Sequence, residues 1–133
     1  MDYFRLGGTF MNYLINTESN DIFEYDQDYY TLSKNLRTEP WRQATTQEVQ
    51  SYLVEKHIPC IKEEAYRRIT IIYPITKQLN LIYEQADKQA EYTSMVEFIA
   101  NIRLKSNELE SQLSGMSIDE LSLFDCSDDQ YWQ

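Results

Sequence analysis

Residues 60–115 read CIKEEAYRRIT IIYPITKQLN LIYEQADKQA EYTSMVEFIA NIRLKSNELE SQLSG, with apolar side chains recurring every three or four positions. This spacing predicts two long amphipathic helices joined by a short polar break. A large aliphatic side chain left in water forgoes about 1.5–3 kcal/mol. We therefore expect the two apolar stripes to pack together as an antiparallel hairpin, or to face a partner. The expected seam comprises Ile72, Leu79, Ile82, Ile99, Ile102 and Leu109.

Pro74 interrupts the first of these helices. Proline lacks the N–H that would donate to the carbonyl four residues earlier, which costs about 3 kcal/mol in a helix interior. Two outcomes follow: the helix kinks, or it breaks and Pro74 opens a new helix. Ser94 and Glu97 form a capping-box pattern that predicts the start of the second helix, and Gly115 favours its end.

The chain before residue 46 has the pattern of short strands. Residues 13–15 and 22–25 favour extended structure and flank a polar loop, which predicts a β-hairpin. Residues 29–32 offer a third extended piece. Strands this short need a cover, which we expect from Leu36 and Trp41.

Two further capping boxes mark short helices. Thr45 with Glu48 opens one that Ile58–Pro59 is expected to close, and Ser117 with Glu120 opens the last. The predicted fold is therefore α+β: a small N-terminal β-hairpin or meander, a long kinked α-helical hairpin and a short C-terminal helix. The expected segments are 12–45 (small and β-rich), 46–58 (connecting helix), 60–115 (helical hairpin) and 116–133 (short helix and acidic tail). Residues 1–11 are a candidate leader or non-native start, because Gly7–Gly8 can be encoded as a purine-rich ribosome-binding sequence just before Met11.

The formal charge of −10 is concentrated at the two ends of the chain. Residues 1–30 hold six acidic side chains against Arg5, residues 111–133 hold five acidic side chains and no basic one, and the part between is balanced. Phosphate binding needs clustered lysine and arginine, so we expect no nucleic-acid partner. No apolar run reaches membrane-spanning length and no signal-peptide pattern is present, so we expect no membrane partner.

The sequence offers no catalytic set. His57 is the only histidine, which leaves no histidine-based triad or metal cluster, and we place it near a helix C-terminus. Cys60 and Cys126 are far apart and lack metal-type spacing, so neither a disulfide framework nor a zinc site is expected. Asp26 and Asp28 have the spacing of a calcium loop without its glycine and distal glutamate. We predict no enzyme activity, no cofactor and no metal.

Aromatic residues are the strongest indication of binding. The chain contains eleven tyrosines, two tryptophans and five phenylalanines, side chains that are enriched at protein interfaces. Trp132 stands beside the last residue of the sequence, where little local chain can cover it, so it either docks on a partner or frays. The predicted partner-binding residues are Trp41, Phe124, Tyr131 and Trp132.

Two pairs of segments resemble a known class of proteins. YLINTESNDIFEY (13–25) followed by PWRQATTQEV (40–49) is similar to the strand-rich start of tail and tail-fibre assembly proteins of tailed bacteriophages. EEAYRRITIIYPITKQLN (63–80) with IRLKSNELE (102–110) resembles the C-terminal helical module of small phage and prophage tail proteins. Thr76 departs from that pattern, which has a tryptophan there. The resemblance implies polar groups that fix helix register around Pro74: Arg67, Arg68, Lys77, Gln78, Asn80, Arg103, Ser106 and Asn107.

The resemblance implies a tail-associated protein that binds another phage tail or fibre protein, as a minor structural component or as an assembly chaperone. The expected location is then the virion tail or the host cytoplasm. The helical stripes suit a dimer or trimer of the chain as well as an intramolecular hairpin. A competing hypothesis is an anti-defence inhibitor whose acidic ends bind a host nucleic-acid-binding protein.

Overall fold

The computed structural model describes residues 4–6, 9–25 and 38–133, with side chains from residue 12 onward. The described residues form two compact units. One, the sheet unit, comprises Met1–Lys56 with Leu113–Phe124; the other, the hairpin unit, comprises His57–Gln112 with Asp125–Gln133. The predicted α+β class is confirmed, with a small antiparallel sheet followed by long helices and a short C-terminal helix.

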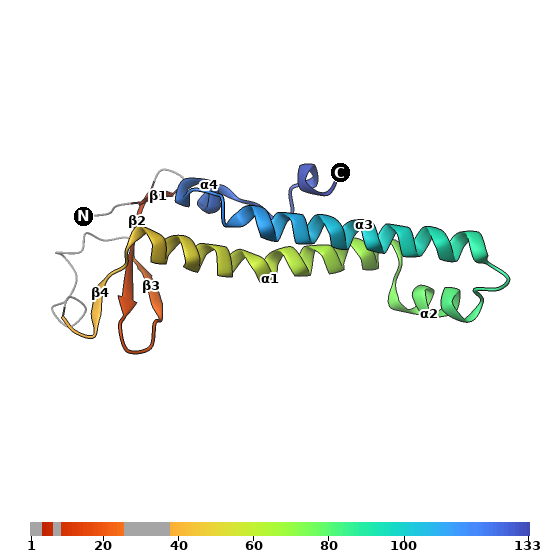
Figure 1. The fold of residues 1–133 in the computed structure, drawn as a ribbon, viewed down its shortest axis with the longest axis horizontal. Coiled ribbons are helices and arrows are strands. Elements are labelled where there is room, and N and C mark those ends of the chain that lie inside the picture. The colour runs from red at the N-terminus through yellow and green to blue at the C-terminus, as the bar shows by residue number, and fades with distance from the viewer. Residues whose placement is uncertain (1–3, 7–8, 26–37) are drawn as a thin grey trace. The chain divides into compact units, whose positions relative to one another are not determined.

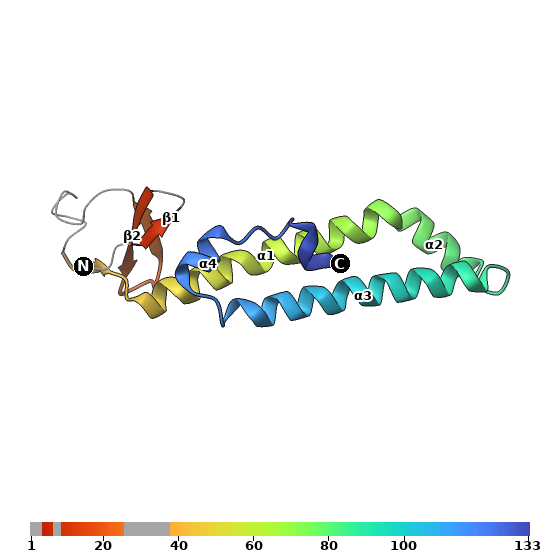
Figure 2. The ribbon, with the colours of Figure 1, turned by 90° about the horizontal axis from the view of Figure 1, so that it is seen from above.

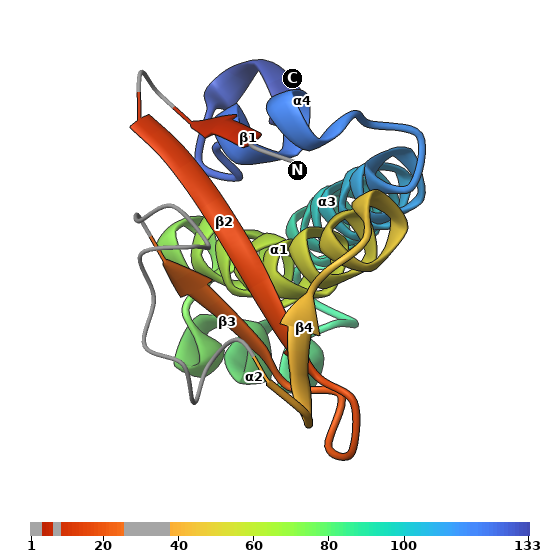
Figure 3. The same ribbon diagram turned by 90° about the vertical axis from the view of Figure 1, so that its left-hand side faces the viewer.

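The sheet is antiparallel and centred on its longest strand (Figure 3). Its strands are β1 (Phe4–Leu6), β2 (Thr9–Asn16), β3 (Ile22–Tyr25) and β4 (Trp41–Gln43). Strand β2 pairs with each of the other three. A strand with several neighbours has its backbone groups satisfied on both edges, which gives this small sheet more stability than an isolated hairpin has.

The predicted hairpin is present, with Ile15 opposite Ile22. Its loop is held by the Asn16 side chain, whose Oδ1 accepts from the backbone N–H groups of Glu18 at 2.9 Å and Ser19 at 3.1 Å. Asn20 has a φ of 64°, a left-handed conformation that asparagine tolerates better than most residues. The predicted extended piece at 29–32 and the expected cover Leu36 lie outside the described residues.

Trp41 differs from the prediction. It begins strand β4, which pairs with Leu14–Asn16 of β2, and its side chain packs beside Leu14 and Tyr25. The sequence predicts Trp41 as part of the cover of the sheet and not as a strand, because a strand of three residues shows too little alternation to be recognised.

Helix α1 (Thr46–Ile72) begins at the predicted capping box. Glu48 N–H donates to Thr45 Oγ1 at 3.2 Å, and Thr45 N–H donates to Glu48 Oε1 at 2.9 Å. The predicted end at Ile58–Pro59 is wrong, because α1 continues through Pro59. Pro59 and Glu55, whose carbonyl loses its donor, are both exposed, so water can hydrate that carbonyl and the tertiary packing of the helix outweighs the cost.

The helix is interrupted at Pro74 and a new helix follows, which is the second of the two predicted outcomes (Figures 1 and 2). Helix α1 ends at Ile72 and α2 (Ile75–Tyr83) follows, with Pro74 as its N-cap residue. Gln78 N–H donates to the Pro74 carbonyl at 3.0 Å. The Gln78 side chain donates to the Tyr73 carbonyl at 2.7 Å, and Lys77 lies over the Tyr73 ring. Two of the polar residues implied by the resemblance thus contact the break itself.

Helix α3 (Gln89–Leu113) starts before the predicted capping box at Ser94. Tyr92 N–H already donates to the Lys88 carbonyl at 3.0 Å. Gln89, Ala90 and Glu91 are good helix formers, so the helix extends backward past the serine.

The last two elements follow α3. Helix α4 (Ile118–Leu123) has its predicted cap, since Ser117 Oγ accepts from Glu120 N–H at 3.1 Å. A short 3₁₀ helix, η3 (Asp129–Trp132), ends the chain.

Each unit has its own apolar core. The buried apolar side chains of the sheet unit are Tyr13, Leu14, Ile15, Tyr25, Ala44, Val49, Leu53, Leu113, Ile118, Leu121 and Phe124. Those of the hairpin unit are Ile61, Ala65, Ile69, Leu81, Met95, Ile102, Leu109 and Trp132. In the hairpin unit α1 and α3 run antiparallel, and Tyr73 contacts Phe98 with ring centroids 5.5 Å apart (Figure 2).

Candidate protein-binding face

Helix α2 has an aliphatic stripe on its surface. Ile75, Leu79 and Ile82 are spaced by four and three residues, which places them on one side of the helix. Their exposed fractions are 49, 52 and 53%, whereas Leu81 is buried. The helix therefore uses Leu81 to pack within the hairpin unit and presents three other aliphatic side chains to solvent. We call Ile75, Leu79 and Ile82 the α2 stripe.

A second apolar surface lies at the end of α1. Ile71 and Ile72 are exposed and border an open groove of about 340 Å³. The groove is lined by Arg67, Arg68, Ile71, Ile72, Phe98, Ile102 and Trp132. Apolar walls beside two arginines suit a ligand that is apolar on one side and acidic or polar on the other.

The arginines of this groove are fixed by a buried carboxylate. Glu64 is 7% exposed and accepts from Arg67 Nε at 2.9 Å and from Arg68 Nε at 2.7 Å. The hydrogen bond from Arg67 is the main reason that the pKa of Glu64 lies below its usual value, with Arg68 adding to it and burial opposing it. Both guanidinium groups are thus held beside the groove by α1 itself.

Arg68 also holds the C-terminal segment. Its Nη2 donates to the Ser127 carbonyl at 2.9 Å and to Asp129 Oδ1 at 2.6 Å, and its guanidinium lies 5.3 Å from the centre of the Trp132 ring. Lys105 Nζ of α3 donates to the Trp132 carbonyl at 2.7 Å. The segment is therefore bound to both long helices of the hairpin unit.

Most of the predicted partner-binding residues pack against other parts of the same chain. Trp132 is 5% exposed and donates from Nε1 to the Cys126 carbonyl at 2.9 Å. It is not a frayed end, and it lines the open groove beside Ile71 and Ile72. That Trp132 binds a partner stays a prediction. Phe124 is buried in the sheet unit, while Trp41 and Tyr131 are half-buried. A local sequence cannot show that distant α1 and α3 residues cover a chain end.

The predicted seam is right for its residues on α3 and wrong for Ile72 of α1 and for Leu79 and Ile82 of α2. Ile102 and Leu109 of α3 are buried and Ile99 is half-buried. Ile72, Leu79 and Ile82 are about half exposed. For the residues of α2, the prediction assumed that one continuous helix runs through Pro74. The helix is interrupted there, so α2 starts in a different orientation and Leu81 faces inward. Because these residues are exposed, the alternative expectation, that they face a partner, remains a prediction.

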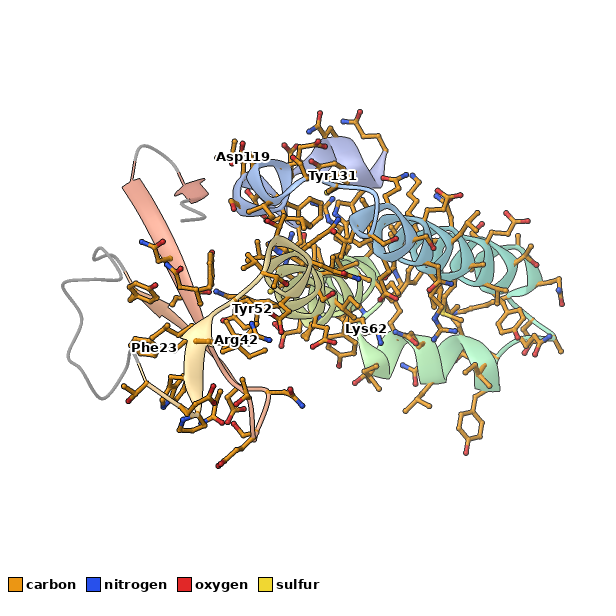
Figure 4. All side chains as sticks on the ribbon, turned by 60° about the vertical axis from the view of Figure 1, so that its left-hand side comes forward. Phe23, Arg42, Tyr52, Lys62, Asp119 and Tyr131 are labelled. Carbon is orange, nitrogen blue, oxygen red and sulfur yellow. The ribbon has the colours of Figure 1, made fainter. Side chains whose placement is uncertain are left out.

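The sheet unit has a hollow of its own, between its strands and the start of α1. Tyr52 of α1, one of its lining residues, is labelled in Figure 4. This hollow of about 390 Å³ is open and is lined by Ile15, Asn20, Ile22, Gln47, Glu48, Ser51, Tyr52 and Glu55. Tyr52, which lines this hollow, meets Tyr13 edge to face, and burial raises the pKa of Tyr13 to about 12. A phenol with so high a pKa is a poor proton donor or nucleophile near neutrality.

The described residues contain no group of three or more histidine, cysteine, aspartate or glutamate side chains placed to hold a metal ion. His57 lies inside α1 rather than at a helix end, because the helix continues beyond Pro59. Asp26 and Asp28 are outside the described residues. Cys60 is exposed, Cys126 is half-buried, and no disulfide joins them. The pKa of the Cys126 thiol is raised, chiefly by burial.

No family model, curated protein or solved structure matches this chain. Among the described residues, no helix combines the length and the apolar character needed to cross a membrane.

Proposed function

We propose that this chain is a non-enzymatic, tail-associated protein of a tailed phage or prophage. In this proposal it binds another tail or fibre protein through the α2 stripe, as a minor structural component or an assembly chaperone. The observation that carries the binding role is the half-exposed stripe of Ile75, Leu79 and Ile82 on a helix that already buries Leu81. The link to phage tails depends on the resemblance of residues 13–25, 40–49, 63–80 and 102–110.

The stripe is suited to docking on a preformed apolar surface. Three aliphatic side chains within two helical turns are the usual anchors of a helix that lies in an apolar groove. Tyr83, which is 91% exposed, ends the same helix and adds an aromatic side chain of the kind enriched at interfaces. Burying these four side chains would recover most of the hydrophobic free energy that they now forgo.

The carboxylates of the C-terminal segment favour this proposal over the inhibitor hypothesis. Asp125 Oδ1 accepts from the Ser127 N–H at 3.0 Å, Asp128 Oδ1 accepts from the Gln130 N–H at 3.1 Å, and Asp129 pairs with Arg68. Side chains engaged in local caps and ion pairs are less available to a basic groove on another protein.

Quantitative mass spectrometry of purified virions, set against the infected-cell lysate, tests the tail assignment. A fixed ratio to a tail protein in virions supports a structural component. Abundance in the lysate with absence from virions supports an assembly chaperone, provided that the chain copurifies with a tail or fibre protein. Copurification with a host nucleic-acid-binding protein alone would instead support the inhibitor hypothesis.

Pull-down with charge variants tests the surface. Leu79→Lys should abolish capture of the tail or fibre protein, because it places a charge in the centre of the stripe. Leu104→Lys is the matched control, since Leu104 is an exposed leucine on α3. Capture should persist at high salt, because an apolar interface is weakly screened. Loss of capture at high salt, or equal effects of the two variants, would contradict docking through the stripe.

Sedimentation analysis of the free chain separates self-association from partner binding. A dimer or trimer that Leu79→Lys converts to a monomer would assign the stripe to a second copy of the chain. A monomer for both proteins agrees with the proposal.

A further inference from the structure

A second open groove of the hairpin unit is lined by residues of α1 and α3. Its volume is about 290 Å³. The buried side chains of Ala65 and Ile69 supply its apolar floor, and Tyr66, which is 61% exposed, borders it. Lys62 of α1, labelled in Figure 4, and Arg103 of α3 also line it, and both are exposed. We call this the basic groove.

The two cations of the basic groove differ from the other basic side chains of residues 38–133. Each of the others has a partner within the chain, in an ion pair, over an aromatic ring or at a backbone carbonyl: Arg42, Lys56, Arg67, Arg68, Lys77, Lys88 and Lys105. Within the described residues, Lys62 and Arg103 make no ion pair and no side-chain hydrogen bond. Their charges are therefore available to a ligand, unlike those of Arg67 and Arg68 in the groove beside Trp132.

The basic groove also contains a buried hydroxyl group. Ser106 of α3 lines it and is only 7% exposed. Serines in helices often donate to the carbonyl four residues earlier, as Ser111 and Ser122 do at 3.0 and 2.7 Å. Ser106 Oγ has no hydrogen-bond partner among the described residues. A buried polar group without a partner is costly, so an acceptor on a ligand would satisfy this hydroxyl.

Ser106 lies midway between the two cations along the hairpin. Arg103 precedes it by three residues, which is ~4.5 Å of helix rise. Counting about 1.5 Å per residue from the contact between Tyr73 and Phe98 places Lys62 at ~4.5 Å from Ser106 in the other direction. Both cations end long side chains that can cover this distance. One anionic group at Ser106 is therefore within reach of all three donors.

We propose that the basic groove binds an acidic peptide segment of another protein. One carboxylate of the segment lies at Ser106 between Lys62 and Arg103, and an adjacent apolar side chain covers the apolar floor. A carboxylate accepts hydrogen bonds from a hydroxyl, an ammonium and a guanidinium group at once.

The size and lining of the basic groove favour a peptide over other anions. Pockets for complete small-molecule ligands usually have about 300–1,000 Å³, so this groove suits one or two side chains of a peptide. Inorganic phosphate has no apolar part and would leave the floor in water. The residues of the basic groove are separate from the α2 stripe, and the inference does not depend on the proposed function.

Selection from a random peptide library tests the ligand class. The library is panned in parallel against the full native chain and against a double variant with Lys62→Gln and Arg103→Gln. Peptides enriched on the native chain alone should carry an aspartate or glutamate next to a large apolar residue. If no peptides are specific to the native chain, or if those that are lack an acidic residue, the proposal is overturned.

Titration of a selected peptide measures the contribution of each cation. Lys62→Gln and Arg103→Gln should each weaken binding by about three- to tenfold. Lys88→Gln is the matched control, since it removes a positive charge outside the groove, and it should change the affinity by less than about twofold. The same loss of affinity in all three variants would show that only net charge matters, which contradicts a defined site.

Ser106→Ala separates binding from folding. Alanine is the better helix former and removes no hydrogen bond within the described residues, so the melting temperature should stay within a few degrees or rise. The affinity for the peptide should fall by about three- to tenfold. A lower melting temperature with unchanged affinity would mean that the hydroxyl serves the fold and not the ligand.

Inorganic phosphate is the competing ligand. At the ionic strength of a chloride control, it should displace no more peptide than chloride does, because it cannot use the apolar floor. Displacement by phosphate well beyond that by chloride would assign the groove to phosphate groups and overturn the peptide proposal.

Discussion

Glu64 shows how one buried side chain organises its surroundings. Its carboxylate is nearly inaccessible, yet it receives hydrogen bonds from two arginines of its own helix. A buried charge is tolerated only when it is paired and hydrogen-bonded. Arg68, fixed by this pairing, then binds Ser127 and Asp129 and covers Trp132. The position of the chain end therefore depends on a glutamate far from it in sequence.

Glu64→Gln should lower the free energy of unfolding by about 1–3 kcal/mol, because Arg68 would keep its burial and lose its charged partner. Glu63→Gln is the matched control, since Glu63 is the exposed neighbour on the same helix, and its effect should stay within about 0.5 kcal/mol. Urea denaturation followed by circular dichroism measures both. Equal decreases in the free energy of unfolding for the two variants would show that the pairing of Glu64 with the arginines adds nothing beyond the effect of removing one negative charge from α1.

Glu48 makes the free energy of unfolding of the sheet unit depend on pH in the acidic range. Hydrogen bonds from Arg42 and then from the Thr45 backbone lower its pKa from 4.5 to about 2. A carboxyl group with a lowered native pKa contributes stability above its unfolded pKa, and this contribution is lost as the pH falls from about 4.5 to about 2. Denaturation between these pH values should show a smaller pH dependence for Glu48→Gln than for the native chain. Glu18→Gln, in the exposed hairpin loop, should leave the dependence unchanged.

The break at Tyr73–Pro74 decides which side of α2 is buried. The three- and four-residue spacing of apolar residues continues across Pro74, so the sequence suggests one helix with one face. The backbone instead ends α1 at Ile72 and restarts at Ile75. Leu81 thereby faces the hairpin, and Ile75, Leu79 and Ile82 are left on the surface.

Two leucines of α2 provide a direct test of this phase. Leu81→Ala should destabilise the chain by about 2–4 kcal/mol, because it leaves a cavity in the core. Leu79→Ala should cost less than about 1 kcal/mol, because this side chain is half exposed. Thermal and urea denaturation measure the difference. The reverse order of effects would mean that α2 lies on the hairpin with the phase that the sequence first suggested.

The buried face of α3 is the one that its sequence predicts, with Ile102 and Leu109 in the core. Ile102→Asp should unfold the hairpin unit, because it places an unpaired charge among buried aliphatic side chains. Leu104→Asp, two residues further on the exposed side of the helix, should leave the melting transition within a few degrees of that of the native chain. Loss of helical circular dichroism in the first variant but not in the second is the expected result.

The described residues form two units, and α1 and α3 each contribute residues to both. The hairpin unit also includes the last residues of the described chain, whose tryptophan completes its core. The C-terminal segment is therefore structural as well as a border of the groove. Its acidic composition suggests a solvated tail. In the structure Asp125 and Asp128 accept hydrogen bonds from nearby backbone N–H groups, and Asp129 pairs with Arg68.

Removing residues 125–133 should destabilise the hairpin unit, contrary to the expectation that a frayed tail can be lost without effect. Hydrogen exchange should accelerate at the amides of 61–69 and 102–109, because Trp132 no longer covers the helices. Amides of β2 and β3 should exchange as before, since they belong to the other unit. Unchanged exchange in the helices would contradict a structural role for Trp132.

The sequence by itself determined the features that depend on neighbouring residues. The hairpin at 13–25, the caps at Thr45 and Ser117, the interruption at Pro74 and the buried face around Ile102 all follow from local chemistry or from helical period. These features suffice for the α+β class. A helical period cannot be continued across a position where the helix is interrupted. The prediction continued it across Pro74, and the predicted face of α2 was therefore wrong.

Only the tertiary structure decided what depends on contacts between distant residues. Trp41 pairs into the sheet, and Trp132 is covered by Arg68. Each outcome depends on which surfaces folding brings together, and the free energy of such long-range burial has no signature within a few residues of sequence. The exposed α2 stripe is of the same kind, because a side chain is left in solvent only when the rest of the fold has no surface to place against it.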